Sequence, residues 1–477
     1  MVKRTKIVAT ISDRRCDVDF LQRLYNEGMN VVRLNTAHQS PSDSIKLIEN
    51  VRKVSNKIAI LVDTKGPEIR TTPMASGSGF DVVAGDNVVV KGNPEGISSR
   101  ECLYLSYSNI AADVHVGASL LIDDGDIGME VISKTEDSLV CEVKNHGTIK
   151  GRKSVNIPGA AISLPSLSDK DIDFIHFAID QKIDFIAHSF VRRKEDLMGI
   201  QQILDERKSP IRLIAKIENQ EGVDNIEEIL DHAYGIMVAR GDLGIEIPAE
   251  KIPVIQRRLI RKCTESKKPV IIATQMLHTM ITNPRPTRAE VSDIANAIYQ
   301  RTDAIMLSGE TAYGEYPEEA VTVMTTVADE IESQLQPDAE ITFKRINNLV
   351  TAVLAKSAVK ATCLLPIKAV VVDTLSGRTA RYMAAYRGLI PVYAMCYKEH
   401  VMRHLALSYG VQAFYMEPRF TKDEFVREAM KTLLEQKKVE VDDLVLVVGG
   451  SFGHSNGATF MEISKVSSML HFGEVKA

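Results

Sequence analysis

Short apolar runs alternate with amphipathic stretches along most of the chain. The first run, Thr5–Thr10, precedes a segment from Val18 to Gly28 in which hydrophobic residues recur at helical spacing. Nearly continuous apolar runs are typical of parallel strands that are buried on both faces. Similar runs follow at Asn30–Asn35, Ile58–Thr64, Phe185–Phe190, Leu213–Asn219, Gly235–Leu243, Val270–Met276 and Asp303–Glu310. These eight strand–helix units predict an α/β fold with a closed (β/α)8 TIM barrel.

The segment from 67 to 164 interrupts this pattern after the third strand. It shows alternating hydrophobic positions and turn signals such as AGDN, KGNPEG and IDDGDIG. We therefore expect a small inserted all-β domain. The remaining segments, 1–66 and 165–337, together approach the roughly 250 residues of a typical barrel.

Residues 338–477 predict a third domain with its own sheet. It begins with a helical stretch at Asn347–Cys363. Strand patterns follow at Ala369–Thr374, Val392–Cys396, Val411–Met416 and Asp443–Val448, with helical patterns between them. This order predicts a C-terminal α/β domain.

Composition narrows the classes of function. The 477 residues carry a net charge of −5 without a long basic run, which argues against general nucleic-acid binding. No window approaches the roughly 20 apolar residues of a membrane span, and the N-terminus does not resemble a signal peptide. The six cysteines are scattered without a CxxC pair, so we expect reduced thiols and a cytoplasmic protein.

Polar residues stand where the predicted barrel strands end. In a TIM barrel, catalytic groups lie at the carboxyl ends of the strands. The residues at these ends are Arg33, Asn35 and His38; Asp63, Thr64 and Lys65; Lys216, Glu218 and Asn219; Arg240, Gly241 and Asp242; Thr274 and Gln275; and Ser308 and Glu310. We expect them to converge on one rim.

The acidic and basic members of this set suggest metal-assisted chemistry on an anion. Glu218 and Asp242 offer oxygen ligands for Mg²⁺, although each carboxylate could instead form a structural ion pair. Lys216 and Arg33 offer positive charge for a transferring phosphoryl group. A lysine at a strand end could alternatively form a Schiff base, as in aldolase-type barrels. No Cys/His cluster predicts a zinc site.

Smaller polar residues at the rim allow two interpretations each. The glycine at position 241 lets backbone N–H groups approach an anion, or merely permits a tight turn. The hydroxyl of Thr274 could bind substrate or cap a helix. Asn35 and Asp63 could ligate a cation or cap turns.

Six segments resemble the pyruvate kinase family. They are VVRLNTAH (31–38), LVDTKGPEIR (61–70), IRLIAKIENQEGV (211–223), MVARGDLGIEIP (237–248), ATQMLHTMITNPRPTRAEVSDIANAI (273–298) and DAIMLSGETAYGEYP (303–317). The resemblance covers nearly the whole chain. It implies transfer of a phosphoryl group from phosphoenolpyruvate to ADP, giving pyruvate and ATP in the last step of glycolysis.

The resemblance also implies roles for the rim residues. Lys216 would stabilise the phosphoryl group and Arg33 would meet the phosphate, whereas Glu218 and Asp242 would hold Mg²⁺ or Mn²⁺. The substrate carboxylate would bind to backbone N–H groups at Gly241 and Asp242 and to the Thr274 hydroxyl. The nucleotide phosphates would contact Arg70 and His38. K⁺ would bind to Asn35, Asp63 and the Thr64 carbonyl. Ser308 and Glu310 would take part in a proton relay to the enolate, and the inserted domain would close as a lid.

Two departures from the family pattern affect specific contacts. Ala37 stands where the family usually has a serine that binds K⁺, although Glu68 is typical of K⁺-dependent members. Ser12–Arg15 replaces the usual Gly-Pro-Ala-Ser-like loop beside the nucleotide, which leaves the base preference open.

The C-terminal domain contains a segment that predicts regulation. Backbone N–H groups and hydroxyls at the start of a helix can bind an anion, although an ordinary N-cap is an equal alternative. The residues are Thr374, Ser376, Gly377, Arg378 and Thr379, and the glycine-rich loop 449–457 could complete the pocket. The segment resembles the family's effector site, which implies a sugar-phosphate or nucleotide effector. The family is commonly a homotetramer.

Two other functions compete with this one. A barrel aldolase or lyase acting on a pyruvate enolate would use the same metal chemistry without a nucleotide. A non-catalytic relative that only binds metabolites would not need Lys216, Glu218, Asp242 and Thr274 intact.

Overall fold

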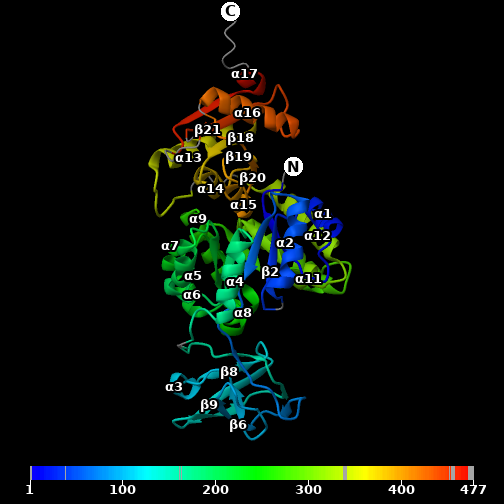
Figure 1. Ribbon diagram of the computed structural model, residues 1–477, viewed down its shortest axis with the longest axis vertical. Coiled ribbons are helices and arrows are strands. Elements are labelled where there is room, and N and C mark those ends of the chain that lie inside the picture. Colours follow the sequence, from blue (N-terminus) through cyan, green and yellow to red (C-terminus); the bar gives the residue numbers. More distant parts are fainter. Residues whose placement is uncertain are drawn as a thin grey trace, which may run out of the picture.

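The computed structural model describes residues 3–37, 39–160, 162, 164–336, 341–419, 421–450, 452 and 457–470. Three bodies follow one another along its longest axis, with the barrel in the middle (Figure 1). The inserted β domain lies at one end of the barrel and the C-terminal domain at the other. The predicted barrel, β insertion and C-terminal α/β domain are therefore confirmed.

Eight parallel strands close the barrel in the order β1-β17-β16-β15-β14-β13-β3-β2. Their bounds are β1 (Lys6–Thr10), β2 (Val31–Asn35), β3 (Ala59–Asp63), β13 (Phe185–His188), β14 (Arg212–Ile217), β15 (Gly235–Ala239), β16 (Val270–Ala273) and β17 (Ala304–Leu307). Several strands end earlier than predicted. β15 ends at Ala239, because the chain turns at once into the short helix α8 (Arg240–Glu246).

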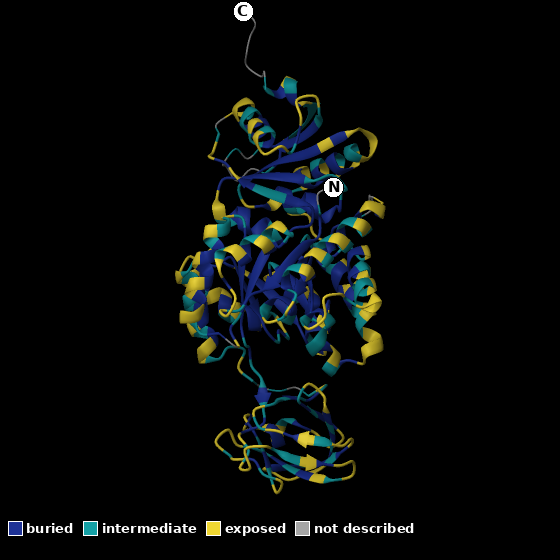
Figure 2. Cartoon of the chain, turned by 90° about the vertical axis from the view of Figure 1, so that its right-hand side faces the viewer, coloured by how far each residue is buried: buried dark blue, intermediate teal, exposed yellow. Residues whose placement is uncertain are grey.

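Helices cover the outside of the barrel, with exposed outer faces and buried strands behind them (Figure 2). The larger ones are α1 (Val18–Asn26), α2 (Pro41–Val54), α4 (Asp169–Asp180), α5 (Lys194–Glu206), α7 (Ile226–His232), α9 (Ile252–Ser266), α10 (Arg288–Tyr299) and α12 (Pro317–Gln334). Short helices α6 (Gln220–Asp224) and α11 (Gly309–Ala312) follow β14 and β17. Capping boxes at Ser40, Ser168 and Thr287 fix the starts of α2, α4 and α10.

The inserted domain forms its own core. A seven-stranded sheet has the order β4-β12-β8-β9-β10-β6-β7, and a two-stranded sheet pairs β11 with β5. The elements are β4 (Ile69–Arg70), β5 (Phe80–Val82), β6 (Asn87–Gly92), β7 (Leu103–Leu105), α3 (Ile110–Asp113), β8 (Ser119–Ile122), β9 (Ile127–Lys134), β10 (Ser138–Val143), β11 (Gly147–Ile149) and β12 (Ser154–Asn156). The two chain crossings to the barrel flank this domain, one before β4 and one after β12.

The C-terminal domain is a five-stranded sheet of order β20-β19-β18-β21-β22 with helices on both faces. Its elements are α13 (Leu349–Leu364), β18 (Ile367–Thr374), α14 (Arg378–Ala385), β19 (Val392–Cys396), α15 (Glu399–His404), β20 (Val411–Tyr415), α16 (Lys422–Glu435), β21 (Leu444–Gly449), β22 (Phe460–Lys465) and α17 (Val466–Leu470). Sequence analysis did not predict β22, which pairs antiparallel with β21.

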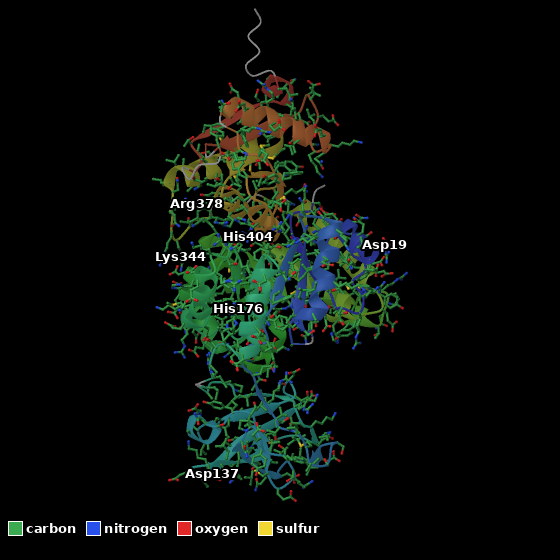
Figure 3. All side chains as sticks on the ribbon, in the orientation of Figure 1. Asp19, Asp137, His176, Lys344, Arg378 and His404 are labelled. Carbon is green, nitrogen blue, oxygen red and sulfur yellow. The ribbon has the colours of Figure 1, made fainter. Side chains whose placement is uncertain are left out.

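The C-terminal domain also closes one end of the barrel. Leu407, just after α15, belongs to the same buried apolar cluster as Val8, Ile214 and Met237 inside the barrel. Figure 3 labels His404 at the level where the two domains meet. The open end of the barrel is therefore the opposite one, where the strands finish and the inserted domain begins.

All six cysteines lie in the described residues and are free thiols. None of the helices within the described ranges combines the length and the apolar character needed to cross a membrane.

Candidate active site

The alternation of side chains along the barrel strands brings the polar residues together. Strand residues two apart point to the same side. Val31, Leu61 and Ile214 belong to the apolar cluster inside the barrel, and the residues two positions later are Arg33, Asp63 and Lys216. A charged layer therefore lies directly above an apolar one, at the carboxyl ends of the strands.

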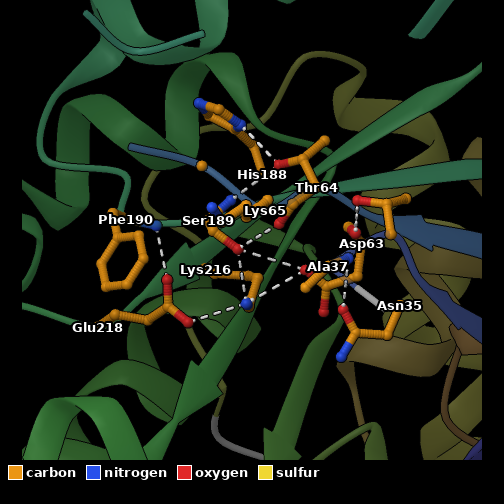
Figure 4. Close-up of polar contacts among 12 residues, drawn as sticks. Asn35, Ala37, Asp63, Thr64, Lys65, His188, Ser189, Phe190, Lys216 and Glu218 are labelled. Carbon is orange, nitrogen blue, oxygen red and sulfur yellow. Dashed lines mark hydrogen bonds and ion pairs between the residues drawn. The ribbon is translucent and has the colours of Figure 1, made fainter. Parts of the chain in front are cut away.

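Lys216 is the centre of this charged layer (Figure 4). Its Nζ lies 2.9 Å from Oε1 of Glu218 and 3.1 Å from Oδ1 of Asp63. The other oxygen of Asp63 lies 2.7 Å from Nε of Arg33. All four side chains are at most 11% exposed, so these charges interact with little solvent screening.

Strand β13 contributes a residue that sequence analysis missed. Its last residue, His188, pairs with Ala215, so the next residues, Ser189 and Lys216, are neighbours at the rim. Nζ of Lys216 donates to Oγ of Ser189 at 2.7 Å, and that hydroxyl donates to the Thr64 carbonyl at 2.7 Å. The signal available in the sequence was the hydroxyl of Ser189 near the end of the apolar run Phe185–Phe190, since the other rim residues also stand at or near the ends of such runs.

The pKa values reflect this arrangement. Burial alone would lower the pKa of Lys216, but Asp63 and Glu218 outweigh it and raise the pKa, so the amine stays protonated. For Asp63, burial is outweighed by the charges of Lys216 and Arg33, which lower its pKa. Burial raises the pKa of Glu218 to about 7, and the nearby charge of Asp242 acts in the same direction.

A second group of contacts fixes the ends of β15 and β16. Oγ1 of Thr274 accepts the Gly241 N–H at 2.7 Å, and Nη2 of Arg240 donates to the Thr274 carbonyl at 2.8 Å. Thr274 and Gln275 adopt left-handed backbone φ values of 70° and 54°. This conformation is especially unfavourable for a β-branched residue such as Thr274, and the bonds to Arg240 and Gly241 hold it in place.

Glu310 is buried at the end of β17 and is bound by backbone groups. Its carboxylate accepts the N–H groups of Ser308 at 2.7 Å and Leu277 at 3.1 Å. These bonds tie the loop after β17 to the loop after β16. Ser308 and Glu310 therefore lie beside the Thr274 loop, on neighbouring strands of the barrel.

A cavity of about 790 Å³ lies between the barrel rim and the inserted domain. Asp242, Asn219 and Phe190 line it from the barrel side, and Arg70 lines it from β4. Nε of Arg70 donates to Glu68 at 2.7 Å. From the inserted domain come Asp123 and Asp124, which sequence analysis interpreted only as part of a turn, and Lys153, which it did not single out. Lys153 lies 2.9 Å from Asp123.

The structure thus gathers Arg33, Asp63, Lys216 and Glu218 into one cluster. Asn35 lies beside Asp63 by strand register and accepts the Ala37 N–H at 3.1 Å. Asn219 instead caps α6 through a 2.7 Å bond to Gly222 N–H. His38 lies outside the described residues. The segment from Thr374 to Thr379 lies in the C-terminal domain and runs from the end of β18 into the first turn of α14. Residues 451 and 453–456 of the glycine-rich loop lie, like His38, outside the described part of the chain.

The donor set suits a hard divalent cation. Among the described residues, no three His, Cys, Asp or Glu side chains converge on a point that would hold a metal by themselves. Mg²⁺ typically uses one or two carboxylates together with substrate oxygens and water. Glu218 and Asp242 are close enough for the charge of Asp242 to raise the pKa of Glu218, which is the repulsion that a cation between them would relieve.

Comparison with known proteins places these residues in a family. A family model for the pyruvate kinase barrel domain matches residues 2–321, and one for the pyruvate kinase alpha/beta domain matches residues 352–464. The pyruvate kinase of Borreliella burgdorferi is 48% identical over 98% of both chains. That of Bacillus licheniformis is 42% identical over 99% of this chain and 82% of its own. A solved pyruvate kinase from Cryptosporidium parvum aligns with a TM-score of 0.92 at 35% identity, covering 97% of this chain and 96% of its own.

Proposed function

Since the chain belongs to the pyruvate kinase family and transfers a phosphoryl group from phosphoenolpyruvate to ADP, we propose that the Lys216 cluster carries this step. An ADP oxygen bonds to phosphorus as the bond to the enol oxygen breaks, and protonation on carbon then gives pyruvate. The observation that supports the proposal is the protonated amine of Lys216, held between Asp63 and Glu218 at the rim. Lys216 and Arg33 stabilise the negative charge on the phosphoryl group during transfer.

Glu218 and Asp242 are proposed to hold Mg²⁺ or Mn²⁺. A bound divalent ion would neutralise charge on the phosphate and the enolate oxygen. Oε2 of Glu218 accepts the Phe190 N–H at 2.6 Å, which fixes the carboxylate plane while Oε1 faces Lys216. The carboxylate is therefore oriented before any ligand arrives, as a positioned site requires.

Asn35, Asp63 and the Thr64 carbonyl are proposed to bind K⁺. All three offer oxygen atoms, and strand register places Asn35 directly beside Asp63. Figure 4 shows these residues on the side of Lys216 away from Glu218. A monovalent cation here would add positive charge next to the phosphate. Ala37 supplies no hydroxyl to this group, so one ligand has to come from water.

The substrate carboxylate is proposed to bind at Gly241, Asp242 and Thr274. An ideal Cβ at Gly241 would stand 3.3 Å from Thr274 Oγ1, so glycine keeps this approach open. The proton for the enolate carbon is proposed to arrive through Ser308 and Glu310, which share backbone bonds with the neighbouring loop.

Arg70 and His38 are proposed to contact the nucleotide phosphates. Arg70 lines the cavity beneath the inserted domain, which would act as a lid that excludes water and protects the phosphoryl group from hydrolysis. Lys153 lies on the lid side of the same cavity, so lid closure would bring a further cation toward the nucleotide.

Regulation and assembly are further parts of the proposal. The segment from Thr374 to Thr379, which runs from the end of β18 into the first turn of α14, is proposed to bind a sugar-phosphate or nucleotide effector. A homotetramer is supported by α13, on which Leu349, Val350 and Val353 are more than half exposed. A cytoplasmic location fits the six free thiols.

One assay tests the central proposal. Purified protein is mixed with phosphoenolpyruvate, ADP, Mg²⁺ and K⁺, and ATP and pyruvate are measured in parallel. We expect equal amounts of both products. Pyruvate without ATP would indicate a lyase, and neither product would indicate a metabolite-binding protein.

A further inference from the structure

The turn after β13, residues 189–193, contacts two of the charged groups at the rim through successive residues (Figure 4). The Ser189 hydroxyl accepts a hydrogen bond from Nζ of Lys216 at 2.7 Å. The Phe190 N–H donates to the Glu218 carboxylate at 2.6 Å. Phe190 has a left-handed backbone φ of 56°, which is uncommon for a residue other than glycine. One short turn therefore orients both the amine proposed to act on the phosphoryl group and a carboxylate proposed to hold the metal.

Arg192 connects the same turn to the second crossing, the segment 157–168 between β12 and α4. Its Nη1 donates to the Ile162 carbonyl at 2.9 Å, and its Nη2 donates to the Leu164 carbonyl at 3.2 Å. Asp196, in the first turn of α5, accepts hydrogen bonds from Nη2 at 3.1 Å and from Nε at 3.4 Å. The Arg192 side chain is 18% exposed and that of Asp196 is 6% exposed. The guanidinium group is therefore held in one orientation, with its rigid fork against the crossing.

The first crossing, the segment 64–68 between β3 and β4, packs against this turn as well. Gly66 has a backbone φ of 68°, and an ideal Cβ at this position would stand 2.8 Å from Cβ of Ser189 and 3.3 Å from Cδ2 of Phe190. A side chain at position 66 would collide with the turn, so glycine allows the chain to pass this close. Both crossings thus touch the turn that contacts the charged groups at the rim.

A buried carboxylate joins the two crossings at their barrel ends. Oδ1 of Asp171 accepts the N–H groups of Lys65 at 3.1 Å and Gly66 at 3.4 Å, in the first crossing. Its other oxygen accepts the Ser168 N–H at 3.1 Å, at the end of the second crossing. These bonds anchor both crossings to the start of α4, whereas Arg192 holds the second crossing at a point closer along the chain to the inserted domain.

Arg192 lines the cavity beneath the inserted domain, but its donors are already used by the protein. Two of its hydrogen bonds go to carbonyls of the crossing and two go to Asp196, which leaves little capacity for a ligand. Lys216 and Glu218 have separate partners in the turn. Arg192 therefore acts on the position of the inserted domain, and not directly on the reacting groups.

We propose that Arg192 is a positioning residue that fixes the inserted domain over Lys216 and Glu218, and thereby directs the phosphoryl group to ADP instead of water. This inference rests on the proposed function, in which the inserted domain closes over the site as a lid. With the lid held in place, Arg70 and Lys153 meet the nucleotide and water is excluded. Without this contact, a water oxygen bonds to phosphorus as the bond to the enol oxygen breaks. The water loses a proton and the enol carbon gains one, which gives inorganic phosphate and pyruvate without ATP.

The test compares R192M with the wild type as full-length enzymes, with ATP, pyruvate and inorganic phosphate measured in the same reactions. We expect R192M to raise the KM for ADP at least about fivefold and to form more pyruvate than ATP, because both hydrogen bonds to the crossing are lost. The KM for phosphoenolpyruvate should stay within about twofold of the wild-type value, since Lys216 and Glu218 keep their partners. A merely structural role would lower the fraction of folded enzyme, which reduces kcat without changing either KM or the ratio of the products.

Two further variants control this experiment. Arg207, at the other end of α5, is exposed and pairs with Asp180 at 2.8 Å, so R207M should keep the wild-type KM for ADP and form equal amounts of ATP and pyruvate. R192K keeps the positive charge without the fork of two donors, so its KM for ADP should lie between those of R192M and the wild type. If R192M does not reach the wild-type melting temperature, R192K replaces it in the comparison.

Two results would overturn the inference. One is a wild-type KM for ADP together with equal amounts of ATP and pyruvate in the Arg192 variant, and the other is the same set of changes in R207M. K216M separates this inference from the proposed function. A K216M enzyme that forms ATP at a near-normal rate would refute the proposed function itself. If K216M is inactive while R192M behaves as the wild type, only the role of Arg192 is refuted.

Discussion

The two ends of the barrel both bury charged side chains, but they do so in opposite ways. At the carboxyl ends of the strands, Lys216, Asp63 and Glu218 are packed together. Their neighbours Phe190, Asn219 and Asp242 line a cavity of about 790 Å³. At the other end, Asp303 binds both guanidinium nitrogens of Arg387, at 2.8 and 2.6 Å, under the C-terminal domain.

The difference lies in what remains to be bound. Asp303 also accepts the N–H groups of Val270 and Tyr409, so its oxygens are fully used by the protein itself. Glu218 has a raised pKa beside Asp242, and the cavity leaves space for ligands. Buried charge by itself therefore does not identify a functional site. A buried charged group identifies a functional site when it can still bind a ligand and lies next to a cavity.

The largest expected effect is on the rate of ATP formation, and it should distinguish Lys216 at the open end of the barrel from Lys6 at the closed end. K216M should lower the rate of ATP formation at least about 1,000-fold, because a charge aimed at the transferring group is lost. K6M is the matched control, since Lys6 is 4% exposed and donates to the Val411 carbonyl at 2.6 Å at the closed end. It should change kcat by less than about twofold and mainly reduce stability. Steady-state kinetics on both variants decides, and a K216M enzyme with near-normal turnover would refute the assigned role.

The next effect concerns stability at the closed end. R387M leaves Asp303 buried without its cation, so the free energy of unfolding should fall by about 3–5 kcal/mol in urea titrations. The KM for phosphoenolpyruvate should stay at the wild-type value in the folded enzyme. R23M is the control, because the pair of Arg23 and Glu318, 2.9 Å apart, is exposed to solvent and should contribute little to the free energy of unfolding. If R387M and R23M lowered the free energy of unfolding equally, burial of the ion pair would not explain its contribution to stability.

A smaller effect is the pH dependence of the closed end. Burial lowers the pKa of His404 from 6.5 to about 2. Below pH 6.5 the unfolded chain takes up a proton that the folded protein does not, so stability is present above pH 6.5 and is lost as the pH falls. The slope from this residue is at most about 1.4 kcal/mol per pH unit. Between pH 6.5 and 5, the free energy of unfolding of H404F should therefore fall less steeply than that of the wild type, by up to about 1.4 kcal/mol per pH unit.

The control for this experiment is H232Q, because His232 is exposed. It should leave the pH profile unchanged. If H404F and the wild type lose stability equally between pH 6.5 and 5, the buried neutral imidazole is not responsible.

The smallest expected effect is on K⁺ activation, from a substitution that adds one hydroxyl oxygen at the open end of the barrel. A37S supplies a hydroxyl next to Asn35 and Asp63, so the K⁺ concentration for half-maximal activity should fall several-fold, up to about tenfold, or 1.4 kcal/mol. The melting temperature without K⁺ should not change. Activation curves with K⁺ against Na⁺ measure this, and an unchanged K⁺ requirement would argue against the proposed site.

Sequence reasoning predicted the parts of the fold that repeat. The eight apolar runs matched the eight barrel strands because buried parallel strands carry a strong local signal. The strand ends were less certain: the run at Gly235–Leu243 extended past Ala239, since an apolar residue in the first turn of α8 looks the same as one in a strand. The predicted lysine and carboxylates met at the rim because strand ends meet there by topology.

Pairings between distant residues could not be predicted in this way. Arg387 and Asp303 are 84 positions apart, and nothing local to either residue indicates a partner. The roles of Ser189 and Lys153 depend on side-chain direction across two strands and across the cavity. β22 was missed because its pattern resembles a surface segment until it pairs with β21.

The insertion of Leu407 into the barrel core has a consequence for biosynthesis. After all eight barrel strands have been synthesised, the apolar interior at the closed end of the barrel stays exposed until Leu407 has left the ribosome. A fragment that ends near residue 336 should therefore aggregate and bind chaperones. Leu407, which completes the apolar core of the barrel, is translated only as part of the C-terminal domain.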